Sequence, residues 1–133
     1  MYKSTEVYEM NSACNAKEEL LRVLATPSGL IPDFFRIKCA DITIKACTKR
    51  ALEQFGVYED PNPVVAKLHT NKTGNDLKEF LDKLDVVYDC GYGGQELFGT
   101  VWLNDGTWLT REEYDGSEGW VHQKLPEIPE DLL

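Results

Sequence analysis

The sequence of 133 residues lacks long apolar runs, and no stretch approaches the roughly 18 apolar residues of a membrane-spanning helix. It also lacks a secretory signal, because no basic segment precedes an apolar one in the first twenty residues. We therefore expect a cytoplasmic protein with no membrane association.

Cysteine pairs of the C-x-x-C type are missing, and with them the close ligand spacing of a structural zinc site. The four cysteines are Cys14, Cys39, Cys47 and Cys90. Because we expect a reducing compartment, we predict four free thiols and no disulfide. The two histidines, His69 and His122, are not placed beside a cysteine by the sequence, so we predict no nucleophilic pair, no metal and no cofactor.

Basic residues are few: 14 Lys and Arg stand against 23 Asp and Glu, and the net charge is −9. This balance argues against binding to phosphate backbones or anionic membranes and favours a basic protein partner. The charge is polarised, with a net +2 over residues 1–50 and a net −11 over residues 51–133. Within residues 89–133, ten acidic side chains are opposed by Arg111 and Lys124 alone.

One basic group departs from this pattern, and the sequence leaves its role open. It consists of Arg36, Lys38, Lys45, Lys49 and Arg50. Residues 51–57 faintly resemble the first helix and turn of a helix-turn-helix, but no capped recognition helix follows them. We therefore expect no direct nucleic-acid binding.

Helices are predicted between about residues 12 and 85. Asn15 and Glu18 have the spacing of a capping box, and leucines at helical spacing predict a helix that ends near Ala25. Residues 41–55 have an apolar residue every three or four positions, which predicts a second helix.

Two more helices are predicted before the C-terminal part. A short one covers residues 64–68, because Asn62 can cap it and Pro63 suits the first helical position. The clearest covers residues 76–84, with a cap at Asn75 or Asp76 and apolar residues at i, i+3, i+4 and i+7.

Strands are predicted at both ends of the chain. Two short ones cover residues 5–10 and 34–39. The apolar side predicted for the second consists of Phe35, Ile37 and Cys39. The remaining strands cover residues 86–89, 97–103, 107–114 and 119–125, and an acidic tail follows at residues 126–133. The sequence thus predicts one α+β domain over residues 1–133, with N-terminal helices packed on one face of a C-terminal antiparallel β-meander of about residues 86–125.

The turn at residues 104–106 decides which face of the meander each tryptophan occupies. A three-residue turn with Gly106 in the left-handed conformation pairs Trp102 with Trp108, whereas a two-residue turn pairs Leu103 with Trp108. We favour the first, which gives an aliphatic face for the helices and a partly exposed aromatic face. The alternative is that the tryptophans are core residues.

Acidic and aromatic residues of the meander are the candidate partner-binding residues, because charge of one sign steers a basic partner and aromatic side chains anchor it. They are Trp102, Asp105, Trp108, Glu112, Glu113, Asp115, Glu118 and Trp120. We expect the acids to be exposed at strand and turn positions; simple solubility is the alternative explanation for them. Glu112 and Glu113 alternate along a strand, so they point to opposite faces and make no close catalytic pair.

A W-x-x-R-x-E-Y-D-G-S-E-x-W pattern followed by P-x-I-P closes the chain. Its residues are Trp108, Arg111, Glu113, Tyr114, Asp115, Gly116, Ser117, Glu118 and Trp120, then Pro126, Ile128 and Pro129. This C-terminal third resembles small accessory proteins of bacteriophages and prophages. The resemblance implies a small acidic protein that binds and blocks a host protein, including nucleic-acid-binding defence complexes, in the manner of anti-CRISPR or DNA-mimic anti-restriction proteins.

We therefore expect an inhibitor or adaptor in the host cytoplasm whose partner is a basic host protein or ribonucleoprotein complex. Its oligomeric state stays open. Two alternatives are a small hydrolase or transferase with an unrecognised site, and an immunity protein against a toxin nuclease. Affinity capture separates a binding protein from an enzyme, because an inhibitor retains one basic complex stoichiometrically and an enzyme retains little.

Overall fold

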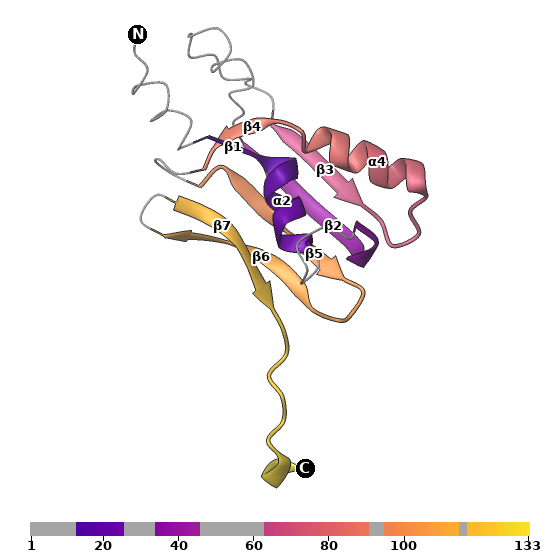
Figure 1. Cartoon of the computed structure of the whole chain (residues 1–133), viewed down its shortest axis with the longest axis vertical. Coiled ribbons are helices and arrows are strands. Elements are labelled where there is room, and N and C mark those ends of the chain that lie inside the picture. Colours follow the sequence, from indigo (N-terminus) through magenta and orange to yellow (C-terminus); the bar gives the residue numbers. More distant parts are fainter. Residues whose placement is uncertain (1–12, 26–33, 46–62, 91–94, 115–116) are drawn as a thin grey trace, which may run out of the picture.

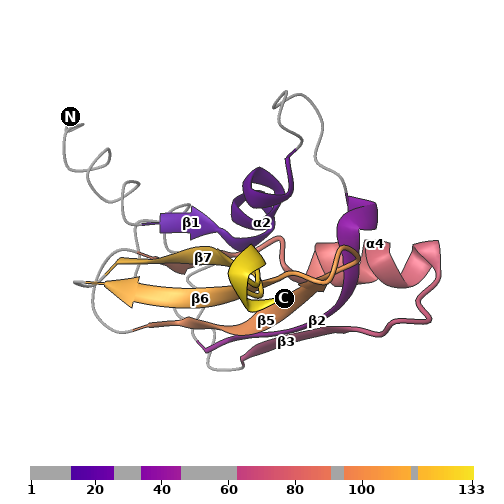
Figure 2. The ribbon, with the colours of Figure 1, turned by 90° about the horizontal axis from the view of Figure 1, so that it is seen from below.

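The structure, a computed structural model, describes residues 13–25, 34–45, 63–90, 95–114 and 117–133. Within these residues, five antiparallel strands form a sheet in the order β3-β2-β5-β6-β7, and two α-helices lie against one of its faces (Figures 1 and 2). The strands are β2 (Ile37–Ile44), β3 (Val64–Leu68), β5 (Leu97–Leu103), β6 (Trp108–Tyr114) and β7 (Ser117–Gln123). The predicted α+β class is confirmed, and so is the meander of β5, β6 and β7. The strand predicted at residues 86–89 does not belong to this meander, because residues 87–89 pair with residues 13–15 in a separate two-stranded sheet.

Helix α2 (Ala16–Leu24) begins at the predicted cap. The Asn15 side chain accepts a hydrogen bond from the Glu18 amide at 3.0 Å, which satisfies one of the free N–H groups of the first turn. Leu20 and Leu24 are fully buried in the core, so the predicted apolar stripe faces the sheet.

A disulfide joins Cys14 to Cys90, with 5.7 Å between their Cα atoms. The two cysteines meet because β1 (Ala13–Asn15) pairs antiparallel with β4 (Val87–Asp89) in a separate two-stranded sheet. The prediction of four free thiols is therefore wrong. It rested on compartment and local spacing, which do not reveal a pairing between residues 76 apart in sequence.

Helix α4 (Gly74–Lys83) confirms the clearest predicted helix but begins at a different cap. The Thr73 hydroxyl accepts a hydrogen bond from the Asp76 amide at 3.1 Å, and the Asp76 carboxylate accepts one from the Thr73 amide at 3.0 Å. The predicted cap at Asn75 or Asp76 is wrong, because in this reciprocal capping box the acidic residue comes three positions after the cap.

Replacing Thr73 with alanine is expected to lower the free energy of unfolding by about 1 kcal/mol, because the Asp76 amide loses its acceptor. Thr73→Ser keeps the hydroxyl and serves as the control. Urea unfolding measures both variants, and equal stabilities of the alanine and serine proteins would contradict the cap.

Two of the predicted helices are strands. Residues 41–44 belong to β2 and residues 64–68 form β3, and the two strands pair antiparallel with each other. Buried side chains alternate along them, as Ile42 and Ile44 do on β2, so the period is two and not three to four. The rest of the helix predicted for residues 41–55 lies almost entirely outside the described residues.

The strand predicted at residues 34–39 is also corrected. Phe34–Arg36 is a short 3₁₀ helix, η1, and the pairing of β2 with β5 shifts between Ile37 and Cys39. The shift places Cys39, a free thiol, opposite Trp102 on the face away from the buried Ile37, whereas simple alternation predicted one face for both. Phe35, predicted on the apolar side, is exposed.

One apolar core lies between the sheet and the helices, and α4 contributes Phe80 and Leu81 to it. The buried residues of β2, β3, β5 and β6 point to this side, and no helix in the described part of the chain covers the other face of the sheet (Figure 2). No helix in the described ranges is long and apolar enough to cross a membrane. The predicted strand at residues 5–10 and Cys47 lie outside those ranges.

Candidate functional site

The turn between β5 and β6 places two tryptophans side by side. Gly106 has a φ of +86°, the left-handed conformation that a three-residue turn needs. Trp102 pairs with Trp108 across the two strands, so the favoured register is confirmed. Their neighbours Val101 and Leu109 also pair and are buried in the core.

Both tryptophans belong to the face of the sheet that the two helices leave uncovered, which we call the open face. Its central side chains are Asp41, Thr43, Phe98, Thr100, Trp102, Trp108 and Thr110. Trp102 is 42% exposed and Phe98 37% exposed, while Trp108 is half-buried. Sheets covered on one side usually turn polar residues outward, so these outward aromatic rings make the open face the candidate site.

A hollow of about 250 Å³ lies on the open face between Phe98 and Trp102. Gly99 lines it with a φ of +145°, and a Cβ at this position would lie 2.2 Å from the Asp41 carbonyl oxygen. Only glycine therefore lets β5 approach β2 this closely. The hollow is below the usual size of small-molecule pockets, so it suits a single side chain of a partner better.

Cations already contact aromatic rings in this protein. Lys45 Nζ lies 5.4 Å from the centroid of the Phe98 ring, and Arg111 Cζ lies 4.8 Å from that of Trp120. Both distances fall within the range of cation–π interactions. The exposed ring of Trp102 offers the same kind of contact to a cation of a partner.

Two of the candidate acids are exposed on β6 or in the turn before it. Asp105 is exposed in the turn, and hydrogen bonds from the hydroxyl and amide of Thr107 hold the pKa of its carboxyl below the usual value. Glu112 is exposed near the other end of β6, and the exposed Glu113 alternates to the opposite face. Asp115 lies outside the described residues.

The candidates Glu118 and Trp120 lie on the helix side of the sheet. The Glu118 side chain is 1% exposed and accepts hydrogen bonds from Arg111 Nη2 at 2.7 Å and from the amides of Glu96 and Leu97 at 2.8 and 3.1 Å. The expectation of an exposed acid at this position is therefore wrong, because β7 begins before Glu118 and turns its carboxylate inward.

Arg111 is the centre of a buried charge network that joins β6 and β7 to α2 and β4. Its side chain is 2% exposed, and Nη1 lies 3.2 Å from Oε2 of Glu19. Nη2 donates to the Tyr88 hydroxyl at 2.8 Å, and that hydroxyl donates to Glu19.

Burial and the hydrogen bond to Glu19 raise the pKa of Tyr88. Burial alone would lower the pKa of Arg111, but the hydrogen bond to Glu118 and the nearby carboxylates raise it, so the guanidinium stays charged.

The network accounts for three residues of the C-terminal sequence pattern, namely Arg111, Glu118 and Trp120. This part of the pattern therefore describes how the β6–β7 hairpin is fixed to the body, and not an exposed interface. One signal in the sequence points to it: Arg111 comes two residues after the core residue Leu109 and so shares its face. Counting charges along the chain misses this alternation.

The described residues offer little for catalysis. Thr107 Oγ1 lies 2.8 Å from His122 Nε2, but the same hydroxyl donates its proton to Asp105, so the imidazole does not activate it as a nucleophile. In the same part of the chain, no group of three or more His, Cys, Asp and Glu side chains is placed to hold a metal ion. No protein-family model, curated protein or solved structure matches the chain.

Proposed function

We propose that the protein is a non-catalytic binding protein whose recognition surface is the open face. The observation that carries the proposal is the exposed Trp102, which lies beside Trp108 on an otherwise well-ordered antiparallel sheet. Tryptophan is among the residues that most often dominate the energy of protein interfaces. Its burial against a partner removes a large apolar surface from water.

A basic protein surface fits the open face best. The net charge of −9 attracts such a partner over long range, and alternation along β6 puts the exposed Glu112 on the same face as Trp108. An arginine of the partner has the chemistry to stack on Trp102 and to pair with a carboxylate at the same time.

A narrower form of the proposal is an inhibitor of a host nucleic-acid-binding defence complex, of the anti-CRISPR or DNA-mimic type, in the host cytoplasm. The resemblance of the C-terminal third to phage accessory proteins supports it. The Cys14–Cys90 disulfide weighs against a reducing cytoplasm, because disulfides persist mainly in oxidising compartments. The broader proposal of a basic protein partner does not depend on the compartment.

Affinity capture from a cell lysate at low and moderate salt tests the proposal. The wild-type protein should retain one basic protein or complex stoichiometrically, and more of it at low salt, because salt screens the attraction. Trp102→Ala should weaken the interaction by about 2 kcal/mol, roughly 30-fold in affinity, because the anchoring ring is lost.

Lys83→Ala is the matched control, because Lys83 is exposed on α4, on the covered side of the sheet. It should retain the partner like the wild-type protein. Equal retention by Trp102→Ala and wild type would place the interface away from the open face. Retention of no protein by the wild type would contradict the binding function and favour the enzyme alternative.

A further inference from the structure

The C-terminal tail, residues 124–133, leaves the body after β7 and extends away from it (Figure 1). Four apolar side chains of the tail are at least 64% exposed. They are Leu125, Ile128, Leu132 and Leu133. Glu127, Glu130 and Asp131 against Lys124 give the tail a net charge of −2. An exposed segment that is both apolar and acidic is suited to bind an apolar surface with positive charge beside it.

Two prolines restrict the backbone of the tail before any partner binds. Pro129 has φ −58° and ψ 145°, which is polyproline II conformation, and Pro126 restricts the chain three residues earlier. Leu125 and Ile128 each directly precede a proline, which favours an extended backbone at both positions. A segment held in this way loses little conformational entropy on binding, and such segments dock on aromatic surfaces.

A surface of matching chemistry lies at the end of the sheet. A hollow of about 230 Å³ is lined by Phe35, Arg36, Leu103, Asn104 and Asp105. Phe35 is 81% exposed and supplies an aromatic surface, while Arg36 and the exposed Lys38 supply positive charge. The Asp105 carboxylate also lines the hollow and offsets part of the charge of Arg36. This hollow gives a use to Arg36, one residue of the basic group whose role the sequence left open.

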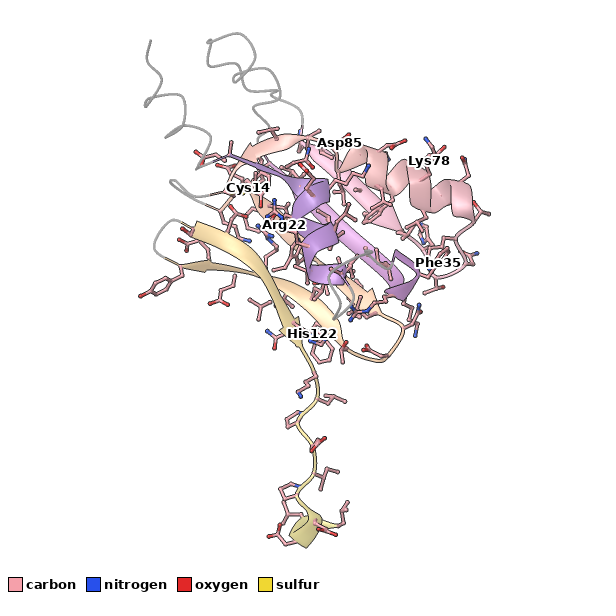
Figure 3. All side chains as sticks on the ribbon, viewed as in Figure 1. Cys14, Arg22, Phe35, Lys78, Asp85 and His122 are labelled. Atoms are coloured by element: carbon pink, nitrogen blue, oxygen red, sulfur yellow. A yellow bond between two sulfur atoms is a disulfide. The ribbon has the colours of Figure 1, made fainter. Side chains whose placement is uncertain are left out.

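The hollow and the base of the tail lie at the same end of the molecule. Gln123, the last residue of β7, pairs with Trp108, and His122 Nε2 lies 2.8 Å from Thr107 Oγ1 just after the β5–β6 turn. On the other side of this turn, the Asn104 amide donates to the Arg36 carbonyl oxygen at 2.8 Å. Figure 3 shows the labelled Phe35 and His122 in the lower part of the body, on either side of this turn.

We propose that the tail docks in this hollow on a second copy of the chain, and that two copies exchange tails about a two-fold axis. The tail points away from its own body, so its own hollow is not the one it approaches (Figure 1). With tail and hollow at one end, two copies that meet end to end exchange both tails at once, and the assembly closes as a dimer. The apolar side chains of the tail cover Phe35, and its acids pair with Arg36. The open face remains free, so this inference is independent of the proposed function.

Sedimentation velocity over a range of concentrations tests the dimer with two charge-reversed proteins. The first carries Glu127→Lys and Glu130→Lys in the tail, and the second carries Arg36→Glu in the hollow. Each alone should dimerise at least tenfold more weakly than wild type, because like charges meet in both contacts. Mixed in equal amounts, they should form a heterodimer, because each contact then joins opposite charges again.

The control Lys83→Glu reverses a charge on α4 and should dimerise like wild type; thermal unfolding checks that all variants are folded. A wild-type protein that stays monomeric up to the highest concentration would overturn the inference. So would charge-reversed proteins that dimerise as tightly as wild type, or a mixture that forms no heterodimer. A tail docked on its own body gives the monomeric result.

Discussion

Replacing Glu118 with alanine is expected to lower the free energy of unfolding by about 3–5 kcal/mol, because it removes one of the two carboxylates that pair with the buried Arg111 and takes away the acceptor of two backbone amides. In the wild-type protein the Glu118 carboxylate pairs with Arg111, whose side chain is 2% exposed, and accepts hydrogen bonds from the amides of Glu96 and Leu97. In the variant these amides lack their acceptor inside the protein. Urea unfolding followed by circular dichroism measures the change.

Glu112→Ala is the control for this experiment, because Glu112 is an exposed acid of the same hairpin. Its unfolding free energy should stay within about 0.5 kcal/mol of wild type. In the double variant Arg111→Met and Glu118→Leu, the loss should be smaller than the sum of the two single losses, because the residues act as one unit. A loss below about 1 kcal/mol for Glu118→Ala would show that this carboxylate is solvated, as the sequence alone suggested.

Removing the Cys14–Cys90 disulfide is expected to cost about 4 kcal/mol, because the bridge closes a loop between residues 76 apart and restricts the unfolded chain. The double variant Cys14→Ser and Cys90→Ser removes the bridge without the use of a reducing agent. Its urea unfolding is compared with that of Cys39→Ser, which removes a free thiol and should change stability far less.

Thiol titration of the denatured protein, purified without reductant, checks the bridge directly. Cys39 should react, whereas Cys14 and Cys90 should not. A count of four thiols would contradict the disulfide and restore the reducing compartment that the sequence first suggested. A serine double variant as stable as Cys39→Ser would show that the bridge does not restrict the unfolded chain.

Elements specified by nearby residues were predictable from the sequence. The cap at Asn15 acts over three residues, and the turn at residues 104–106 needs only the left-handed conformation of Gly106. Strand β2 differs, because its ladder depends on distant partners: Ile44 pairs with both Val64 and Leu97. Its isolated sequence has apolar residues that also fit a helix, so only the neighbouring strands decide between the two.

The candidate site could be predicted in part for the same reason. Once the turn fixes the register, alternation alone brings Trp102 and Trp108 to one face. The burial of Glu118 follows from the meeting of β6, β7 and the start of β5, which no local pattern encodes. Its charge therefore looked like surface charge, although it is paired inside the protein.

Surface-plasmon kinetics with the captured partner test the central claim, that Trp102 anchors a basic protein on the open face. Trp102→Ala should dissociate about 30-fold faster than wild type while its association rate changes by less than about threefold, because an anchor acts after the encounter. Glu112→Lys should instead slow association and reduce its salt dependence, because steering acts before contact. A Trp102→Ala protein that dissociates at the wild-type rate would contradict the account.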